Sequence, residues 1–195
     1  LNSGEADAVL AVGGESILCP IVVSGLAQAK ALSRRNDDPE HACRPFDADR
    51  DGFVIGEGGG ALLIETEEHA VKRGATIYAR LAGWANTSDA HHVTAPCPDG
   101  EGAARCMKLA LARAGMQPSD IGYINAHGTS TPLGDKAETL AVKSVFGGRE
   151  CAPPMSSTKS ATGHLMGAGG LTEVIACIMA LREGVLPPTL HLNTP

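Results

Sequence analysis

Apolar residues along the chain fall into short continuous runs that alternate with segments of helical spacing. Residues 7–12 form such a run, which ends in two glycines and predicts a buried parallel strand. Further strands are predicted at residues 53–65, 76–84, 121–124 and 153–157. Helices are predicted at residues 24–32, 67–73, 103–115, 135–146 and 171–184, the last of them central and buried. This alternation predicts an α/β protein of mainly parallel sheets with helices on both faces.

A strand, a small polar loop and a helix follow one another in residues 121–138. We expect Asp135 to cap the helix and Glu138, three positions later, to complete a capping box. The loop, residues 127–131, then lies at the carboxyl end of a strand, where open α/β sheets place ligand chemistry. His127 in this loop can change protonation near neutral pH. Taken alone, the loop fits a catalytic histidine and a histidine satisfied inside a turn equally well.

A second polar cluster, residues 156–164, lies downstream and carries Lys159 and His164. His164 alone is also explained as a residue bonded to backbone at a helix start, and Lys159 as a surface lysine. Two clusters of chemically active side chains in one chain nevertheless favour a functional site over two unrelated structural histidines.

Composition and charge exclude several classes of function. The chain has 195 residues, 43% of them hydrophobic and 19% charged, which is an ordinary globular composition. Its net charge is -6 and it has no run of Lys or Arg, so we expect no nucleic-acid partner. No apolar run reaches the ~20 residues that a membrane span needs, so we expect no membrane role.

The six cysteines form no C-x-x-C pair, which predicts reduced thiols of a cytoplasmic protein rather than disulfides or a zinc site. The Asp-rich residues 47–52 resemble the start of a calcium loop, but Gly58 stands where that loop needs a Glu. The adjacent His91 and His92 lack a second cluster of ligands. We therefore expect no metal and no resident cofactor.

Three motifs together resemble the β-ketoacyl-acyl carrier protein synthases, and most of all the elongating condensing enzymes of dissociated fatty acid synthesis. They are Arg44–Gly58, Asn125–Asp135 and Ser157–Ala168. The resemblance spans essentially the whole chain. It implies a thiolase-like fold of two similar halves, which this chain contains only in part. Residues 1–75 would be the end of the first half and residues 76–195 most of the second.

The resemblance also implies a decarboxylative Claisen condensation at a Cys-His-His centre with a nearby lysine. Carried over residue by residue, the two histidines are His127 and His164, and the lysine is Lys159. In the family, the nucleophilic cysteine opens a helix in a turn of small residues, before the point where this chain begins. None of the six cysteines here has that setting, so we expect the nucleophile outside residues 1–195.

Further roles carried over from the family concern the substrate, which arrives as a phosphopantetheine arm on an acyl carrier protein. The residues expected to bind the arm are Thr129 and Thr131. Those expected in a mobile loop at the pocket mouth are Asp89, His92 and Thr94, although a solvated loop explains them nearly as well. Because the carrier protein is acidic, a local basic patch should receive it, and the candidates by charge alone are Lys30, Arg34 and Arg35, which equally fit a solvated helix end. The family is dimeric, so we expect a homodimer of the intact protein.

Two expectations concern geometry. The imidazoles of His127 and His164 should face one cavity, each close enough to donate to a common oxygen. Lys159 should pair with Glu173, because a lone carboxylate on an apolar helix is costly to bury. Two alternatives of the same fold stay open: a polyketide ketosynthase and a non-catalytic partner subunit that shapes chain length. An unrelated hydrolase is disfavoured because no G-x-S-x-G elbow is present.

Overall fold

A computed structural model describes residues 1–195 and contains strands, α-helices and two short 3-10 helices. The strands are β1 (Ala8–Glu15), β2 (Gly58–Glu65), β3 (Ile124–Asn125) and β4 (Met155–Ser156). The α-helices are α1 (Pro20–Gln28), α2 (Glu67–Lys72), α3 (Glu101–Ala114), α4 (Pro132–Phe146), α5 (Lys159–Thr162) and α6 (Gly169–Glu183). The 3-10 helices are η1 (Pro39–His41) and η2 (Pro118–Asp120).

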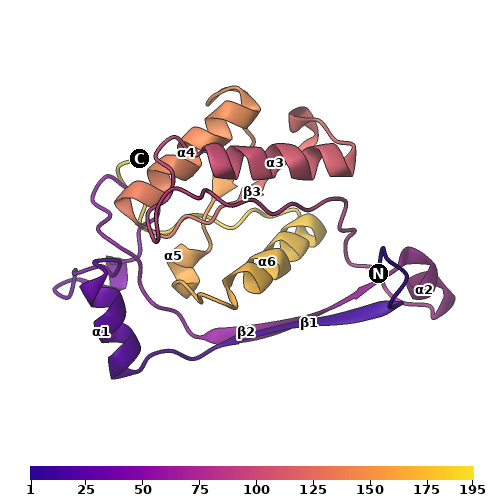
Figure 1. The fold of residues 1–195 in the computed structure, drawn as a ribbon, viewed down its shortest axis with the longest axis horizontal. Coiled ribbons are helices and arrows are strands. Elements are labelled where there is room, and N and C mark those ends of the chain that lie inside the picture. The colour runs from indigo at the N-terminus through magenta and orange to yellow at the C-terminus, as the bar shows by residue number, and fades with distance from the viewer.

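The elements stack in layers (Figure 1). Helices α3 and α4 pack together on one side of β3, whereas α5 and α6 lie on the other side. The β1–β2 ribbon lies beyond α6, which packs against β2. The predicted mixture of helices and strands is therefore confirmed, and helices cover β3 from both sides. None of the helices is both long and apolar enough to cross a bilayer.

The β1–β2 ribbon corrects one prediction. Strand β1 is neither parallel nor buried: it pairs antiparallel with β2, from Ala8↔Glu65 to Glu15↔Gly58. One face of the ribbon packs on α6, with glycines at the closest approach. The other face leaves Leu10 63% and Val12 70% exposed. A short apolar run has the same pattern whichever direction its partner takes, so the sequence could not distinguish the two.

The parallel pair is β3–β4, in which Ile124 faces Met155 and Asn125 faces Ser156. The predicted strand at residues 76–84 is not formed, because this segment has no ladder partner in the chain. It runs extended alongside α3, where a Cβ at Gly83 would lie 2.5 Å from the Ala110 carbonyl oxygen. One sheet is thus antiparallel and the other parallel.

The three longest helices end at glycines, as their sequences predict. Gly115, Gly147 and Gly184 end α3, α4 and α6 in the left-handed conformation. Helix α1, predicted at residues 24–32, lies earlier, because Pro20 fits the first turn and preorganises it. Helix α6 is not fully buried as predicted: its only buried residues are Gly169 and Ala180.

Much of the buried interior is polar, which is unusual for a chain rich in aliphatic residues. The buried polar residues are Arg44, Asp47, Thr129, Ser130, Asp135, Ser156, Ser157, Lys159 and Ser160. All but Ser156 come from the three motif segments singled out in the sequence, and Ser156 directly precedes the third. Buried polar groups need hydrogen-bond partners, so this cluster indicates a specifically organised site rather than a generic core.

Candidate active site

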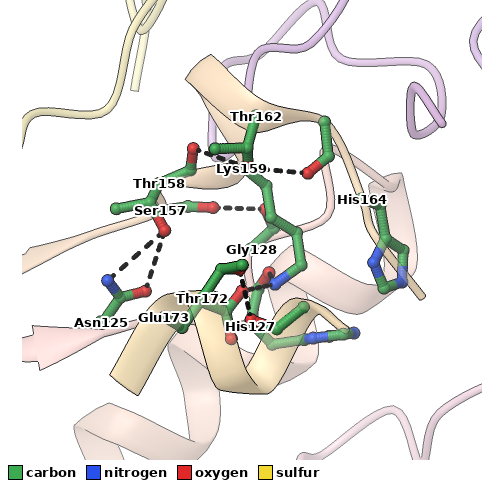
Figure 2. Close-up of polar contacts among 12 residues, drawn as sticks. Asn125, His127, Gly128, Ser157, Thr158, Lys159, Thr162, His164, Thr172 and Glu173 are labelled. Atoms are coloured by element: carbon green, nitrogen blue, oxygen red, sulfur yellow. Dashed lines mark hydrogen bonds and ion pairs between the residues drawn. The ribbon is translucent and has the colours of Figure 1, made fainter. Parts of the chain in front are cut away.

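Two loops bring the histidines together. His127 follows the carboxyl end of β3, and His164 follows the short helix α5. Their ring centroids lie 5.4 Å apart with the planes at 85°. Figure 2 shows both imidazoles on the same side of the Lys159 side chain. The two rings thus lie side by side, while the expectation that they face one cavity and donate to a common oxygen stays a prediction.

Lys159 is the first residue of α5 and only 2% exposed. Its Nζ donates to the His127 carbonyl oxygen at 2.6 Å and forms an ion pair with Glu173 of α6 (Figure 2). The predicted Lys159–Glu173 pair is therefore confirmed. A buried ammonium needs such a partner, because an unpaired charge in the interior costs several kcal/mol.

Both histidines are held neutral at pH 7. Burial, and then the charges of Lys159 and His164, lower the pKa of His127 to about 4, although part of its side chain reaches solvent. Burial and then Lys159 also lower the pKa of His164. Lys159 thus acts in the expected direction, and desolvation of the rings is the larger cause.

The tautomer of His164 follows from a backbone contact. The Met166 N–H donates to His164 Nδ1 at 3.2 Å, so Nδ1 is the acceptor and the proton of the neutral ring is on Nε2. The ring nitrogens of His127 have no hydrogen-bond partner within the chain. The pair can therefore offer N–H donors to a bound oxygen atom.

Asp135 and Glu138 do not form the predicted capping box, since Thr131 is the N-cap of α4. Glu138 instead accepts the N–H groups of His127 and Gly128, both at 2.7 Å. Asp135 is buried and accepts the Phe46 N–H at 2.8 Å. Burial raises the pKa of both carboxyl groups. The sequence signal for these positions is two carboxylates three residues apart on a helix whose other buried residues are apolar.

The residues expected to hold the substrate arm lie on the His127 loop. Thr129 is buried and its hydroxyl lies 3.0 Å from that of Thr131, within hydrogen-bonding distance. Both threonines follow His127 within four positions in the sequence. Each hydroxyl can form a further hydrogen bond.

Two residues of the predicted mouth loop accept hydrogen bonds from nearby backbone N–H groups. Asp89 accepts the Cys97 N–H at 2.8 Å, and His92 Nδ1 accepts the Thr94 N–H at 3.2 Å. All three predicted residues, Asp89, His92 and Thr94, are exposed. The structure joins none of them to the histidine pair by a hydrogen bond.

The three basic residues near α1 differ in availability. Lys30 and Arg34 are exposed. Arg35 is half-buried and donates to the Asp49 carbonyl oxygen at 2.9 Å. Lys30 and Arg34 therefore present free charges to a partner, whereas Arg35 is partly used within the chain.

None of the six cysteines forms a disulfide. The Cys43 thiol lies close to the site and donates to the Lys159 carbonyl oxygen at 3.0 Å. Burial raises its pKa to about 11, whereas a reactive thiol needs a lowered pKa. The pKa values of Cys97 and Cys177 are raised as well.

Comparison with known families gives two matches that together cover most of the chain. Residues 78–193 match the family described as "Beta-ketoacyl synthase, C-terminal domain", and residues 1–70 match "Beta-ketoacyl synthase, N-terminal domain". The chain is 50% identical over 195 residues to the 3-oxoacyl-[acyl-carrier-protein] synthase 2 of Synechocystis sp., covering 100% of this chain and 47% of that protein. It is 53% identical over 193 residues to the protein of the same name from Rhizobium meliloti, covering 98% and 46%. The chain thus spans about half the length of these relatives.

Solved structures of ketosynthases have the same fold as this chain. A ketosynthase bound to its type II PKS acyl-carrier protein aligns with a TM-score of 0.95 and 41% identity, covering 99% of this chain and 48% of that one. A β-ketoacyl synthase from Burkholderia phymatum aligns with a TM-score of 0.91 and 42% identity, covering 99% and 46%. The ishigamide ketosynthase/chain length factor aligns with a TM-score of 0.86 and 39% identity, covering 96% and 44%. The fold expected from the three sequence motifs is confirmed.

Proposed function

The chain belongs to the β-ketoacyl synthase family, and on this premise we propose that it carries the decarboxylation half of a condensing active site. The reaction joins malonyl carrier protein, with loss of carbon dioxide, to an enzyme-bound acyl chain during fatty acid elongation. The observation that carries the proposal is the pair of neutral imidazoles 5.4 Å apart beside a buried Lys159–Glu173 pair.

When carbon dioxide leaves the malonyl group, the electrons of the broken C–C bond pass into an enolate, and negative charge develops on the thioester oxygen. His127 and His164 donate hydrogen bonds to that oxygen. Removing one donor of this kind typically costs about 10²–10³ in rate. The enolate carbon then attacks the carbonyl carbon of the acyl thioester, and the enzyme thiolate leaves.

Lys159 acts without touching the substrate. Its charge disfavours a second positive charge on either imidazole, and its hydrogen bond to the His127 carbonyl oxygen holds that loop in place. Glu173 balances the lysine charge, so the ammonium can stay buried.

The acyl acceptor of the proposed reaction is a cysteine outside residues 1–195. The raised pKa of Cys43 supports this assignment, because its buried thiol is a poor nucleophile. We likewise propose that the boundary between the two halves of the fold lies near Ala75.

Substrate and partners follow from the same proposal. The hydroxyls of Thr129 and Thr131 bind the pantetheine arm, and the loop of Asp89, His92 and Thr94 gates the pocket. Lys30 and Arg34, with a smaller contribution from Arg35, attract the acidic carrier protein by charge. The intact protein is a homodimer of the cytoplasm, where free thiols such as these stay reduced.

A polyketide ketosynthase is the second candidate, supported by the likeness to the ketosynthase of a type II PKS complex. A non-catalytic chain-length partner is less well supported, because a partner without chemistry has no need of His127, Lys159 and His164 together. The primer separates the first two candidates: fatty acid elongation uses a saturated acyl chain, whereas polyketide extension uses a β-ketoacyl chain.

The test uses the complete polypeptide that carries this chain, supplied with acyl and malonyl carrier proteins. We expect β-ketoacyl product from a saturated primer, and loss of carbon dioxide release in His127→Ala and His164→Ala. Lys108→Ala, a change on the outer surface of α3, is the control and should be fully active. A complete polypeptide that releases neither carbon dioxide nor product would refute the proposal.

A further inference from the structure

Residues 44–56, here called the brace, connect the two loops that carry the histidines. The brace holds the His127 loop through the backbone N–H groups of two of its residues. The Arg44 N–H donates to Ser130 Oγ at 3.1 Å, and the Gly52 N–H donates to the Ser130 carbonyl oxygen at 3.0 Å. Ser130 is fully buried and has a φ of 68°, which a residue with a side chain adopts only where its surroundings fix it.

At its carboxyl-terminal end the brace holds His164 by its backbone. The Gly56 N–H donates to the His164 carbonyl oxygen at 3.0 Å, and the His164 N–H donates to the Val54 carbonyl oxygen at 2.8 Å. This is a parallel bridge with Ile55 opposite His164. The Phe53 ring lies edge-on against the imidazole, with the centroids 5.2 Å apart.

Gly56 is packed so closely that no side chain fits. A Cβ at this position would lie 2.2 Å from the Thr162 carbonyl oxygen and 3.1 Å from the Gly163 carbonyl carbon. In return, a Cβ at Gly163 would lie 3.0 Å from Gly56 Cα. Because these neighbours are backbone atoms, a change of rotamer cannot relieve the overlap.

We infer that the brace sets the spacing of the two imidazoles and that Gly56 is a positioning residue for His164. The inference rests on the proposed function for its link to catalysis. An alanine at position 56 must push residues 162–164 away by about 1 Å to restore a normal contact, and a misplacement of about 1 Å can cost about 10²-fold in rate. His164 then leaves its place beside His127 while every catalytic side chain is still present.

The experiment compares Gly56→Ala with wild type in the complete polypeptide. Gly14→Ala is the matched control, since the same change in β1 meets nothing within 4 Å. Carbon dioxide release from malonyl carrier protein gives kcat and KM, and NMR of the imidazole protons reports the ring-current shift that Phe53 imposes on His164. For Gly56→Ala we expect kcat to fall about 10²-fold with KM unchanged, and the His164 protons to lose that shift.

The outcomes separate the two proposals. A wild-type polypeptide that releases no carbon dioxide would refute the proposed function. The NMR shift of the His164 protons in Gly56→Ala would still test whether the brace positions His164. Gly56→Ala with wild-type kcat and an unmoved His164 signal would overturn the inference. If Gly56→Ala does not fold, Phe53→Leu replaces it, because this change keeps the backbone bridge and removes only the ring contact. We then expect kcat to fall between about two- and tenfold, and an unchanged kcat would overturn the inference.

Discussion

Replacing Glu173 by glutamine removes the negative charge that faces Lys159 and keeps the shape of the side chain. The Lys159 side chain is 3% exposed and that of Glu173 18%, so water only weakly replaces the lost carboxylate. Breaking a buried ion pair from one side costs about 3–5 kcal/mol, because the remaining charge stays buried. Since Lys159 keeps its hydrogen bond to the His127 carbonyl oxygen, we expect the lower value, about 3 kcal/mol.

The measurement is urea unfolding of the complete polypeptide, which gives the free energy of unfolding of each variant. Glu183→Gln, at the exposed end of the same helix, is the matched control and should change stability by less than about 0.5 kcal/mol. The double change Lys159→Met with Glu173→Leu removes both charges and should recover most of the loss. The reasoning is refuted if Glu173→Gln is as stable as the control, or if the double variant is less stable than Glu173→Gln.

Three further predictions concern the His127 loop and the exposed face of β1. Glu138→Gln leaves one of the two N–H groups that the carboxylate accepts from the His127 loop without an acceptor, so kcat for carbon dioxide release should fall about 10- to 100-fold while the circular dichroism spectrum stays unchanged. A folded-state pKa of about 4 for His127, against 6.5 normally, means that the unfolded chain binds the extra proton first. The free energy of unfolding from urea titrations should therefore be highest above pH 6.5 and fall as the pH is lowered towards 4. His127→Gln should make that fall smaller. Residues 1–195 expressed alone should bind the dye ANS through the exposed face of β1, yield no β-ketoacyl product from carrier-protein substrates, and show no acylation of their own cysteines.

The parts of the site that the sequence predicted are those governed by local rules. The position of His127 follows from a strand, a polar loop and a helix in succession, which places the loop at the strand's carboxyl end. The Lys159–Glu173 pair follows from the cost of burying a carboxylate on an apolar helix. Both arguments need only a few residues of context.

The parts that escaped prediction depend on contacts between distant segments. Glu138 was assigned to its own helix terminus because a capping box has a fixed spacing, yet the preceding loop turns its backbone N–H groups toward that carboxylate. The direction of β1 depends on β2, which begins 43 residues after β1 ends. The Cys43 thiol and the Lys159 carbonyl oxygen are 116 positions apart. No periodicity encodes such pairings, since each depends on the assembled backbone.

In the proposed decarboxylation, the arrangement of charge explains how two imidazoles can suffice. Glu173 neutralises Lys159 at short range, and backbone N–H groups satisfy Glu138, so no strong anion faces the rings. Lys159 bonds the His127 backbone rather than its ring, which leaves the imidazole nitrogens free for the substrate. A neutral ring with its proton on Nε2 stabilises an enolate oxygen by donating a hydrogen bond, without giving up that proton. The proposed step therefore depends more on the fixed positions of the imidazoles than on their pKa. For that reason we expect a large effect on rate from replacing Gly56, although this residue bears no reactive group.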